Sequence, residues 1–211
     1  MNATRVIIAD DHAIFREGLK QVIAKTATMT IAGEAADGAE LLARIRNEEF
    51  DVVILDISLP GRSGLEILPE IKTIRPKLPV LILSMHPEEQ YALRAMKSGA
   101  AGYLTKGSSS QELIEALQKV TMGKKYISPS VAEMLVKNLD NNGERPLHEH
   151  LSSREFQVMC RIAGGDTPKK IAEDLMVGIK TVNTYRARIL QKMGKKSNAD
   201  LTRYALEHHL L

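Results

Sequence analysis

The chain has 211 residues, of which 44% are hydrophobic and 26% charged, a composition that excludes a disordered protein. The net charge of +3 is divided unevenly: residues 151–211 carry 11 Lys/Arg against 6 Asp/Glu, which leaves a net charge of −2 on residues 1–150. The basic second part favours a polyanionic partner. The sequence shows neither a signal-peptide pattern nor a run of about 18 apolar residues, so we expect a cytoplasmic protein without a membrane partner.

Residues 1–122 alternate short apolar runs with longer segments of helical spacing. Three runs, 6–9, 52–55 and 80–83, are apolar throughout, which is typical of central strands covered on both faces. Weaker strands are predicted at 30–35 and 102–104. This alternation of strands and helices predicts a parallel sheet with helices on both faces and a ligand site at the carboxyl ends of the strands.

A turn-rich stretch begins near residue 123, and we predict a linker over 123–148 that contains one helix at about 129–139. Residues 149–211 show no strand pattern and are predicted to form a separate helical domain. We expect four helices there, at about 153–163, 168–175, 180–193 and 198–209.

Polar side chains follow the predicted strands of the first part. Asp10 and Asp11 come directly after the first strand, Asp56 after the third, Ser84 after the fourth and Lys106 after the fifth. Each of them alone is an ordinary loop or capping residue, but strand order brings them to one edge of the sheet. Three neighbouring carboxylates repel one another and favour a hard divalent cation such as Mg²⁺. We predict that Asp56 is a nucleophile for a phosphoryl group, whose oxygens Lys106 and Ser84 would hold.

Three segments carry a resemblance to a known family: IADDH at 8–12, LDISLPG at 55–61 and GAAGYLTK at 99–106. On these residues, the region 1–122 resembles the CheY-like receiver domain, an α/β fold of the flavodoxin-like type with five parallel strands. The resemblance implies the strand order 2-1-3-4-5. It also implies a sensor histidine kinase as the phosphoryl donor.

The same resemblance assigns roles to individual residues. It implies four ligands for Mg²⁺: Asp10 partly through water, Asp11, Asp56 and the main-chain carbonyl of Ser58. Ser84 and Tyr103 would be a switch pair, in which the hydroxyl moves to the phosphoryl group and the aromatic ring turns inward. The sequence departs from many receivers at Met85, a large residue that would slow access to the acyl phosphate, and at Gly107, where proline is frequent.

Residues 168–193 have the pattern of a helix-turn-helix, with a short helix, a turn near 177–178 and a longer helix from about 180. The outer face of the longer helix carries residues suited to base edges, namely Asn183, Thr184, Ala187, Arg188 and Gln191. Candidates for phosphate contacts are Lys169, Lys180, Thr181, Tyr185, Arg186 and Lys192. From these residues alone, a solvated basic face on a helical bundle is the alternative.

Three segments of this part carry a second resemblance: LSSRE at 151–155, KIA at 170–172 and KTVNTY at 180–185. On them, residues 149–211 resemble the all-α, four-helix DNA-binding domain of the LuxR/NarL type. The resemblance implies that the third helix enters the major groove and that the last helix supports dimerisation through Leu201 and Tyr204. The sequence departs from the family pattern at Lys170, Tyr185 and Ala187.

Together, the two resemblances predict a response regulator of the NarL/FixJ class. A sensor histidine kinase would phosphorylate Asp56 with Mg²⁺ as cofactor, and phosphorylation would favour a homodimer on double-stranded DNA, with RNA polymerase as a further partner. Such a chain accepts a phosphoryl group and dephosphorylates itself, but it is not a dedicated enzyme.

Two alternatives remain at this point. One is a Mg²⁺-dependent phosphatase that uses Asp56 covalently, although the D-x-D pattern of such enzymes is missing. The other is a regulator that does not depend on phosphorylation and whose receiver only mediates dimerisation.

Overall fold

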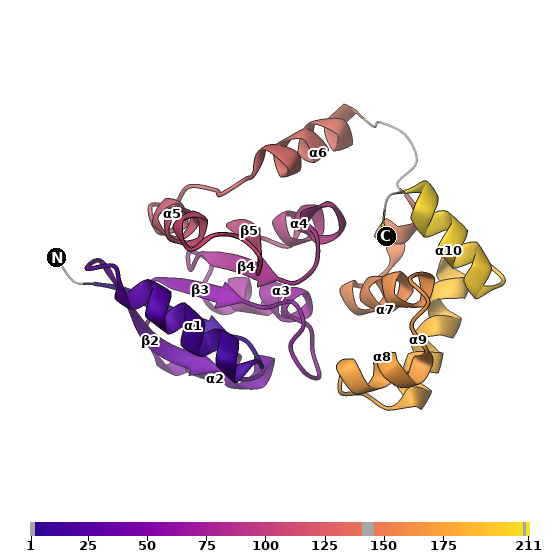
Figure 1. The fold of residues 1–211 in the computed structure, drawn as a ribbon, viewed down its shortest axis with the longest axis horizontal. Coiled ribbons are helices and arrows are strands. Elements are labelled where there is room, and N and C mark those ends of the chain that lie inside the picture. The colour runs from indigo at the N-terminus through magenta and orange to yellow at the C-terminus, as the bar shows by residue number, and fades with distance from the viewer. Residues whose placement is uncertain (1–2, 141–145, 209) are drawn as a thin grey trace. The chain divides into compact units, whose positions relative to one another are not determined.

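The computed structural model describes residues 3–140, 146–208 and 210–211. The chain divides into two compact units, residues 1–135 and 136–211 (Figure 1). The first unit therefore extends past residue 122, the predicted end of the receiver, and the exact domain limits stay a prediction. Residues 141–145 of the predicted linker lie outside the described residues.

The first unit contains one parallel sheet. Its strands are β1 (Thr4–Ala9), β2 (Met29–Ala35), β3 (Val52–Leu55), β4 (Val80–Ser84) and β5 (Gly102–Thr105). They pair in the order β2-β1-β3-β4-β5, which confirms the predicted fold class and strand order (Figure 1). Because the direction of all strands is the same, their carboxyl ends meet at one edge.

Helices cover both faces of this sheet. They are α1 (Ala13–Ala24), α2 (Gly38–Asn47), α3 (Gly64–Ile74), α4 (Glu88–Lys97) and α5 (Ser110–Thr121). On one face α1 and α5 pack against alternate strand residues, including Val6, Ile8, Val52, Ile54, Leu81 and Leu83. The residues between these point to the other face and are also buried, which explains why the central strands are apolar throughout.

The segment after α5 lies against the outer strand of the sheet. The N–H of Tyr126 donates to the carbonyl of Ala101 at 2.9 Å, and Tyr126 forms a β-bridge with Gly102. A Cβ atom at Gly102 would lie 2.9 Å from the Cβ of Tyr126, so this close approach requires glycine. The chain leaving the sheet is therefore held along β5.

A helix follows this segment, α6 (Pro129–Asp140), and its start is bonded to α4. The hydroxyl groups of Ser128 and Ser130 donate to Oε2 of Glu88, at 2.5 and 2.6 Å. Glu88 is the first residue of α4. The beginning of α6 is thus joined to the receiver by side-chain hydrogen bonds as well as by the main chain.

The second unit is helical, as the sequence predicts. It contains a short 3₁₀ helix η1 (Leu147–His150) and the helices α7 (Ser153–Ala163), α8 (Pro168–Asp174), α9 (Ile179–Lys192) and α10 (Asn198–Glu207). Ser152 and Glu155 form a capping box at the start of α7, and Pro168 is placed where its missing N–H is not needed.

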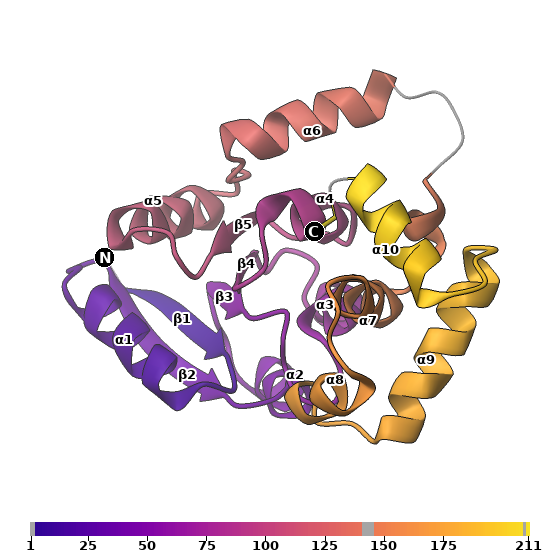
Figure 2. The ribbon, with the colours of Figure 1, turned by 45° about the vertical axis from the view of Figure 1, so that its right-hand side comes forward.

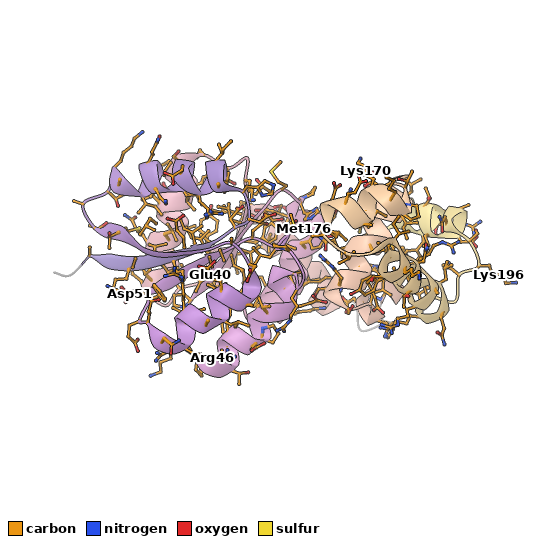
Figure 3. All side chains as sticks on the ribbon, turned by 90° about the horizontal axis from the view of Figure 1, so that it is seen from below. Glu40, Arg46, Asp51, Lys170, Met176 and Lys196 are labelled. Atoms are coloured by element: carbon orange, nitrogen blue, oxygen red, sulfur yellow. The ribbon has the colours of Figure 1, made fainter. Side chains whose placement is uncertain are left out.

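The turn between α8 and α9 is short (Figure 2). Met176, labelled in Figure 3, has a φ of +51° there, and its side chain is 65% exposed. Buried Arg154 of α7 donates through Nη2 to the carbonyl of Leu175 at 3.0 Å and through Nη1 to Gln157 at 2.8 Å. This bond from α7 fixes the main chain just before the turn and so helps to orient α9.

Candidate functional site

Three carboxylates lie together at the carboxyl edge of the sheet. Asp10 and Asp11 follow β1, and Asp56 follows its neighbour β3. Ligand atoms of these residues and of His12 all lie within 4.8 Å of one another. Asp10 and Asp56 are each 2% exposed, and Asp11 is half-buried. The fold therefore concentrates negative charge where little water reaches it.

The ammonium group of Lys106, which follows β5, lies between two of these carboxylates. Its Nζ atom is 2.6 Å from Oδ2 of Asp10 and 2.8 Å from Oδ2 of Asp56. Burial lowers the pKa of Lys106, but the ion pairs with Asp56 and Asp10 outweigh burial and raise that pKa above its ordinary value. Lys106 therefore carries a positive charge at neutral pH.

Asp56 is a buried carboxylate that meets both a cation and a main-chain donor. Burial raises the pKa of Asp56 and outweighs the opposing effect of Lys106, while neighbouring Asp10 raises it further. The N–H of Ser58 donates to Oδ1 of Asp56 at 3.1 Å, and Oδ2 faces Lys106. The two oxygens of this side chain are thus held in defined directions.

The acidic cluster fits a hard divalent cation. With all four groups ionised, three carboxylates and Lys106 leave an excess of negative charge. Oδ1 of Asp11 is buried without a hydrogen-bond partner, although Nδ1 of His12 lies 2.8 Å from it. A buried carboxylate oxygen of this kind is the ligand that Mg²⁺ prefers.

The predicted switch residues lie at the neighbouring strand ends. Ser84 is the last residue of β4 rather than the residue after it, and it is fully buried. Tyr103 of β5 is 2% exposed, so its ring points inward, and its hydroxyl donates to the carbonyl of His86 at 2.8 Å. The N–H of His86 donates to Oγ of Ser84 at 3.2 Å. One loop residue thus bonds to both members of the pair.

His86 has two further contacts that the sequence did not reveal. Its Nε2 lies 3.4 Å from Oγ of Ser58, and its ring stacks on Tyr91 of α4 with the centroids 4.5 Å apart. His86 therefore connects the loop after Asp56, the end of β4 and the start of α4. A histidine two residues after a predicted strand was the available signal, but its partners come from distant segments.

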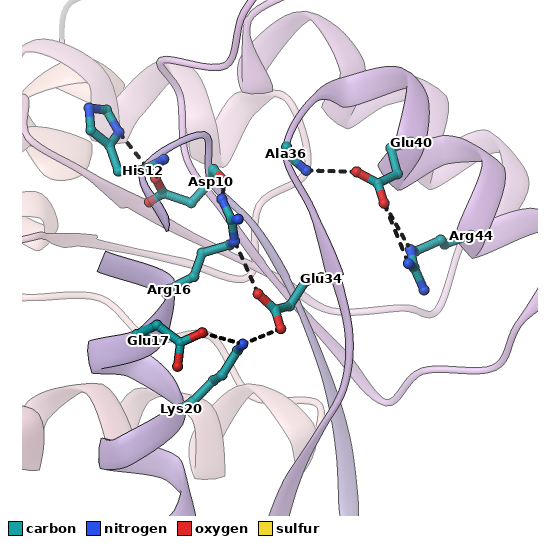
Figure 4. A network of polar contacts seen from close by, with 9 residues as sticks. All are labelled: Asp10, His12, Arg16, Glu17, Lys20, Glu34, Ala36, Glu40 and Arg44. Carbon is teal, nitrogen blue, oxygen red and sulfur yellow. Dashed lines mark hydrogen bonds and ion pairs between the residues drawn. The ribbon is translucent and has the colours of Figure 1, made fainter. Parts of the chain in front are cut away.

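The sequence also did not reveal Arg16 of α1 as a residue of this site. Its guanidinium group bonds to the main-chain carbonyl of Asp10 and to the carboxylate of Glu34 (Figure 4).

The structure also describes the two residues at which the sequence departs from the receiver pattern. Met85 is 75% exposed, and the peptide bond before Gly107 is trans.

In the helical unit, the outer face of α9 presents the residues predicted to contact DNA. Positions three and four apart lie on one helix face. The exposed residues at such spacing are Lys180, Asn183, Thr184, Ala187, Arg188 and Gln191, with Thr181 beside them. Tyr185 and Arg186 are half-buried, and Nε of Arg186 donates to Oδ1 of Asn198. Lys169 on α8 is exposed, 3.9 Å from Glu173.

Lys192 has a structural partner that the sequence did not reveal. Its Nζ lies 2.6 Å from Oε2 of Glu155, a side chain that is 5% exposed. Burial raises the pKa of Glu155, but the bonds from Lys192 and the capping residue Ser152 outweigh burial and hold that pKa below its ordinary value. The ammonium group therefore balances a buried charge, which weakens the interpretation of Lys192 as a phosphate contact.

The prediction that Leu201 and Tyr204 form a dimer contact stays a prediction, although both side chains are buried in the single chain. Leu201 is fully buried and Tyr204 is 4% exposed within the unit itself. The hydroxyl of Tyr204 lies 3.0 Å from Nδ1 of His148, and its side chain lies beside that of His208. Both residues anchor α10 to its own unit. The side chains that α10 leaves exposed are Asn198, Ala199, Arg203, Leu206 and Glu207.

Comparisons with known proteins agree with this organisation. The family model of the response regulator receiver domain matches residues 6–118, and that of the bacterial regulatory proteins of the luxR family matches residues 149–205. The response regulator GacA of Pseudomonas protegens is 35% identical over 208 residues, which cover 98% of this chain and 97% of GacA. The oxygen regulatory protein NreC of Staphylococcus carnosus is 36% identical over 214 residues, covering 98% and 99%.

A solved structure is similar over the whole chain. RcsB from Salmonella enterica serovar Typhimurium, bound to a promoter in the presence of phosphomimetic BeF₃⁻, is 26% identical with a TM-score of 0.61. The similarity covers 99% of this chain and all of that one. Receiver domains generally bind Mg²⁺ at an acidic pocket of the kind formed by Asp10, Asp11 and Asp56. Among the described residues, no helix is both long and apolar enough to span a membrane.

Proposed function

Because this chain belongs to the response regulators that join a receiver domain to a LuxR-type DNA-binding domain, we propose that Asp56 is the residue that accepts the phosphoryl group. The observation that carries this assignment is the enclosed position of Asp56, with Lys106 at 2.8 Å and two further carboxylates beside it. A carboxylate that is buried, oriented and next to a fixed cation is suited to nucleophilic attack on phosphorus.

The transfer of the phosphoryl group from the kinase to Asp56 is a displacement at phosphorus. A carboxylate oxygen of Asp56 forms a bond to phosphorus, the P–N bond of the kinase phosphohistidine breaks, and its electron pair stays on the imidazole. Lys106 exchanges part of its bonding to Asp56 and Asp10 for the oxygens of the phosphoryl group. Autodephosphorylation is the attack of water on the same phosphorus, which releases inorganic phosphate and restores the carboxylate.

Four groups would hold Mg²⁺, namely Asp10 partly through water, Asp11, Asp56 and the main-chain carbonyl of Ser58. When bound, Mg²⁺ neutralises the charge that spreads over the equatorial oxygens during transfer. The buried Oδ1 of Asp11, which has Nδ1 of His12 at 2.8 Å but no hydrogen bond of good geometry, supports this assignment.

Ser84, His86 and Tyr103 would pass the change to the surface of the receiver. The hydroxyl of Ser84 accepts a bond from the N–H of His86, and its own proton can be donated to a phosphoryl oxygen. A movement of Ser84 would disturb the loop whose carbonyl holds the hydroxyl of Tyr103. We propose that this loop, which leads into α4, carries the signal.

The exposed face of α9 is the proposed DNA-reading surface, with Asn183, Thr184, Ala187 and Arg188 toward the bases and Lys180 and Thr181 toward the phosphates. Phosphorylation would favour a homodimer on paired half-sites. The DNA of a bacterial cell lies in the cytoplasm, so we place the chain there, with RNA polymerase as its downstream partner.

The test compares the full-length protein with its Asp56→Asn variant. Both are treated with acetyl phosphate and Mg²⁺, and their intact masses are measured by mass spectrometry. They are then used in a DNA mobility-shift assay. We expect one added phosphoryl group on the unaltered protein alone, together with tighter DNA binding. Equal labelling of the variant would refute the assignment of Asp56.

Two other outcomes identify the alternatives. Steady turnover of a phosphoester would indicate a phosphatase. DNA binding that is the same with and without the phosphoryl group would indicate a regulator independent of phosphorylation.

A further inference from the structure

Arg16 joins the acidic cluster to the body of the receiver. It lies in the first turn of α1, and its side chain is 17% exposed. Nη1 donates to the main-chain carbonyl of Asp10 at 2.5 Å, and Nε donates to Oε2 of Glu34 on β2 at 3.1 Å (Figure 4). A planar guanidinium that makes two bonds is held in one orientation.

The carbonyl of Asp10 is a point at which the main chain needs a partner. The strand β1 ends at Ala9, and the N–H of Asp10 still donates to the carbonyl of Ala35 on β2 at 3.1 Å. On the other side, Oδ1 of Asp10 accepts the N–H of His12 at 2.8 Å. The bond from Arg16 supplies a third attachment, so the turn that presents the carboxylates is fixed on several sides.

Glu34 is itself held in place. Lys20 of α1 forms ion pairs with Glu34 and, at 2.7 Å, with Glu17 (Figure 4). The bonds from Lys20 and Arg16 hold the pKa of Glu34 below its ordinary value, despite an opposing effect of burial. Glu34 is therefore an ionised anchor for the guanidinium of Arg16 at neutral pH.

We propose that Arg16 is a positioning residue: by holding the carbonyl of Asp10, it fixes the turn that carries Asp10 and Asp11 and so strengthens the binding of Mg²⁺. This inference rests on the proposed function of the acidic cluster. Groups that orient metal ligands from behind change metal affinity by about tenfold or more when they are removed.

The sign of the effect separates positioning from simple electrostatics. Arg16 is a cation near a cation site, so Coulomb's law alone predicts that its removal strengthens the binding of Mg²⁺. Positioning predicts the opposite, because the carboxylates lose their fixed spacing. The Arg16→Met variant removes both the charge and the bonds. The Arg16→Lys variant keeps the charge but cannot reproduce the two-pronged geometry.

The experiment titrates Mg²⁺ into the full-length protein by calorimetry at constant ionic strength. We expect the dissociation constant to rise about tenfold in Arg16→Met and by a smaller factor in Arg16→Lys. Arg44→Met is the matched control and should bind Mg²⁺ like the unaltered protein. Arg44 of α2 bonds to Glu40 (Figure 4) and to Glu48, which follows this helix. Unchanged or tighter binding by Arg16→Met would overturn the inference.

A second measurement excludes a general loss of structure. In labelling by acetyl phosphate, the Mg²⁺ concentration for half-maximal rate should rise in Arg16→Met by the same factor as the dissociation constant. The maximal rate at saturating Mg²⁺ should stay within about twofold, because enough Mg²⁺ restores the occupied site. A lower maximal rate with an unchanged dissociation constant would contradict positioning.

The Asp11→Asn variant distinguishes a failure of this inference from a failure of the proposed function. If the unaltered protein binds no Mg²⁺, or if Asp11→Asn binds it equally well, the proposed metal site is wrong. If Asp11→Asn loses Mg²⁺ while Arg16→Met does not, only the role of Arg16 is wrong.

Discussion

Replacing Lys192 by methionine tests whether this residue stabilises the helical unit or contacts DNA. Its Nζ lies 2.6 Å from Oε2 of Glu155, whose side chain is 5% exposed, whereas the Lys192 side chain is 43% exposed. A hydrogen bond to a charged group contributes about 1.5–3 kcal/mol. Because solvent screens the exposed lysine, we expect a loss of about 1–2 kcal/mol in the free energy of unfolding of the helical unit.

The assay is urea unfolding of the full-length protein, read by hydrogen exchange in peptides from α7 and α9. A double-mutant cycle that combines Lys192→Met with Glu155→Gln measures the interaction energy of the pair, since glutamine keeps the capping position but not the charge. The pKa of Glu155 is lowered in the folded protein, so the coupling is complete above its unfolded value of 4.5 and is lost as the pH falls through the folded value.

The result that would refute this reasoning comes from DNA binding. If Lys192 balances Glu155, the salt dependence of DNA affinity should be the same in Lys192→Met and in the unaltered protein. If the unfolding free energy is unchanged but the slope of log affinity against log salt falls by about 0.9, Lys192 contacts a phosphate instead.

Four further predictions follow from the same structure. Lys180→Ala should weaken DNA binding and reduce the salt slope by about one, with thermal unfolding unchanged, because this proposed phosphate contact is exposed on α9. Gly64→Ala should lower the free energy of unfolding by about 1–3 kcal/mol in a urea titration, since its Cβ would lie 2.1 Å from the carbonyl oxygen of Asp56. Tyr103→Phe should cost about 1 kcal/mol in the same titration, because it removes the hydrogen bond from the phenol to the carbonyl of His86. Asp56→Asn should be more stable than the unaltered protein at neutral pH in EDTA. The pKa of Asp56 is raised in the folded state, so the advantage should shrink as the pH falls toward the unfolded value of 3.8, and an advantage that grows on acidification would contradict it.

The sequence predicts most of the fold because local pattern decides it. Short apolar runs such as 52–55 favour strands buried on both faces, and strand order then brings Asp10, Asp56 and Lys106 to one edge without knowledge of the packing. Bounds differ by one or two residues, for example at Ser84, which belongs to β4. End residues depend on hydrogen bonds between strands, which periodicity does not report.

What the sequence does not predict is long-range pairing of polar side chains. Arg16 meets Glu34, and Lys192 meets Glu155, across 18 and 37 positions of the chain. The packing of helices decides such partners, and each residue alone reads as an ordinary surface charge. Leu201 shows the same problem for an apolar residue: helical spacing marks it as inward-facing, but not whether the covering surface is its own unit or a second copy.

The bonds between Glu88 and the start of α6 have a practical meaning for anyone who cuts or recombines this protein. A fragment that stops where α5 ends would remove Tyr126 from the edge of β5 and leave Glu88 without Ser128 and Ser130. The natural place to join the receiver to a different output domain therefore lies beyond Ser130. A chimera joined at that point would keep Tyr126 along the outer edge of β5. A chimera joined earlier would leave that edge of the sheet uncovered.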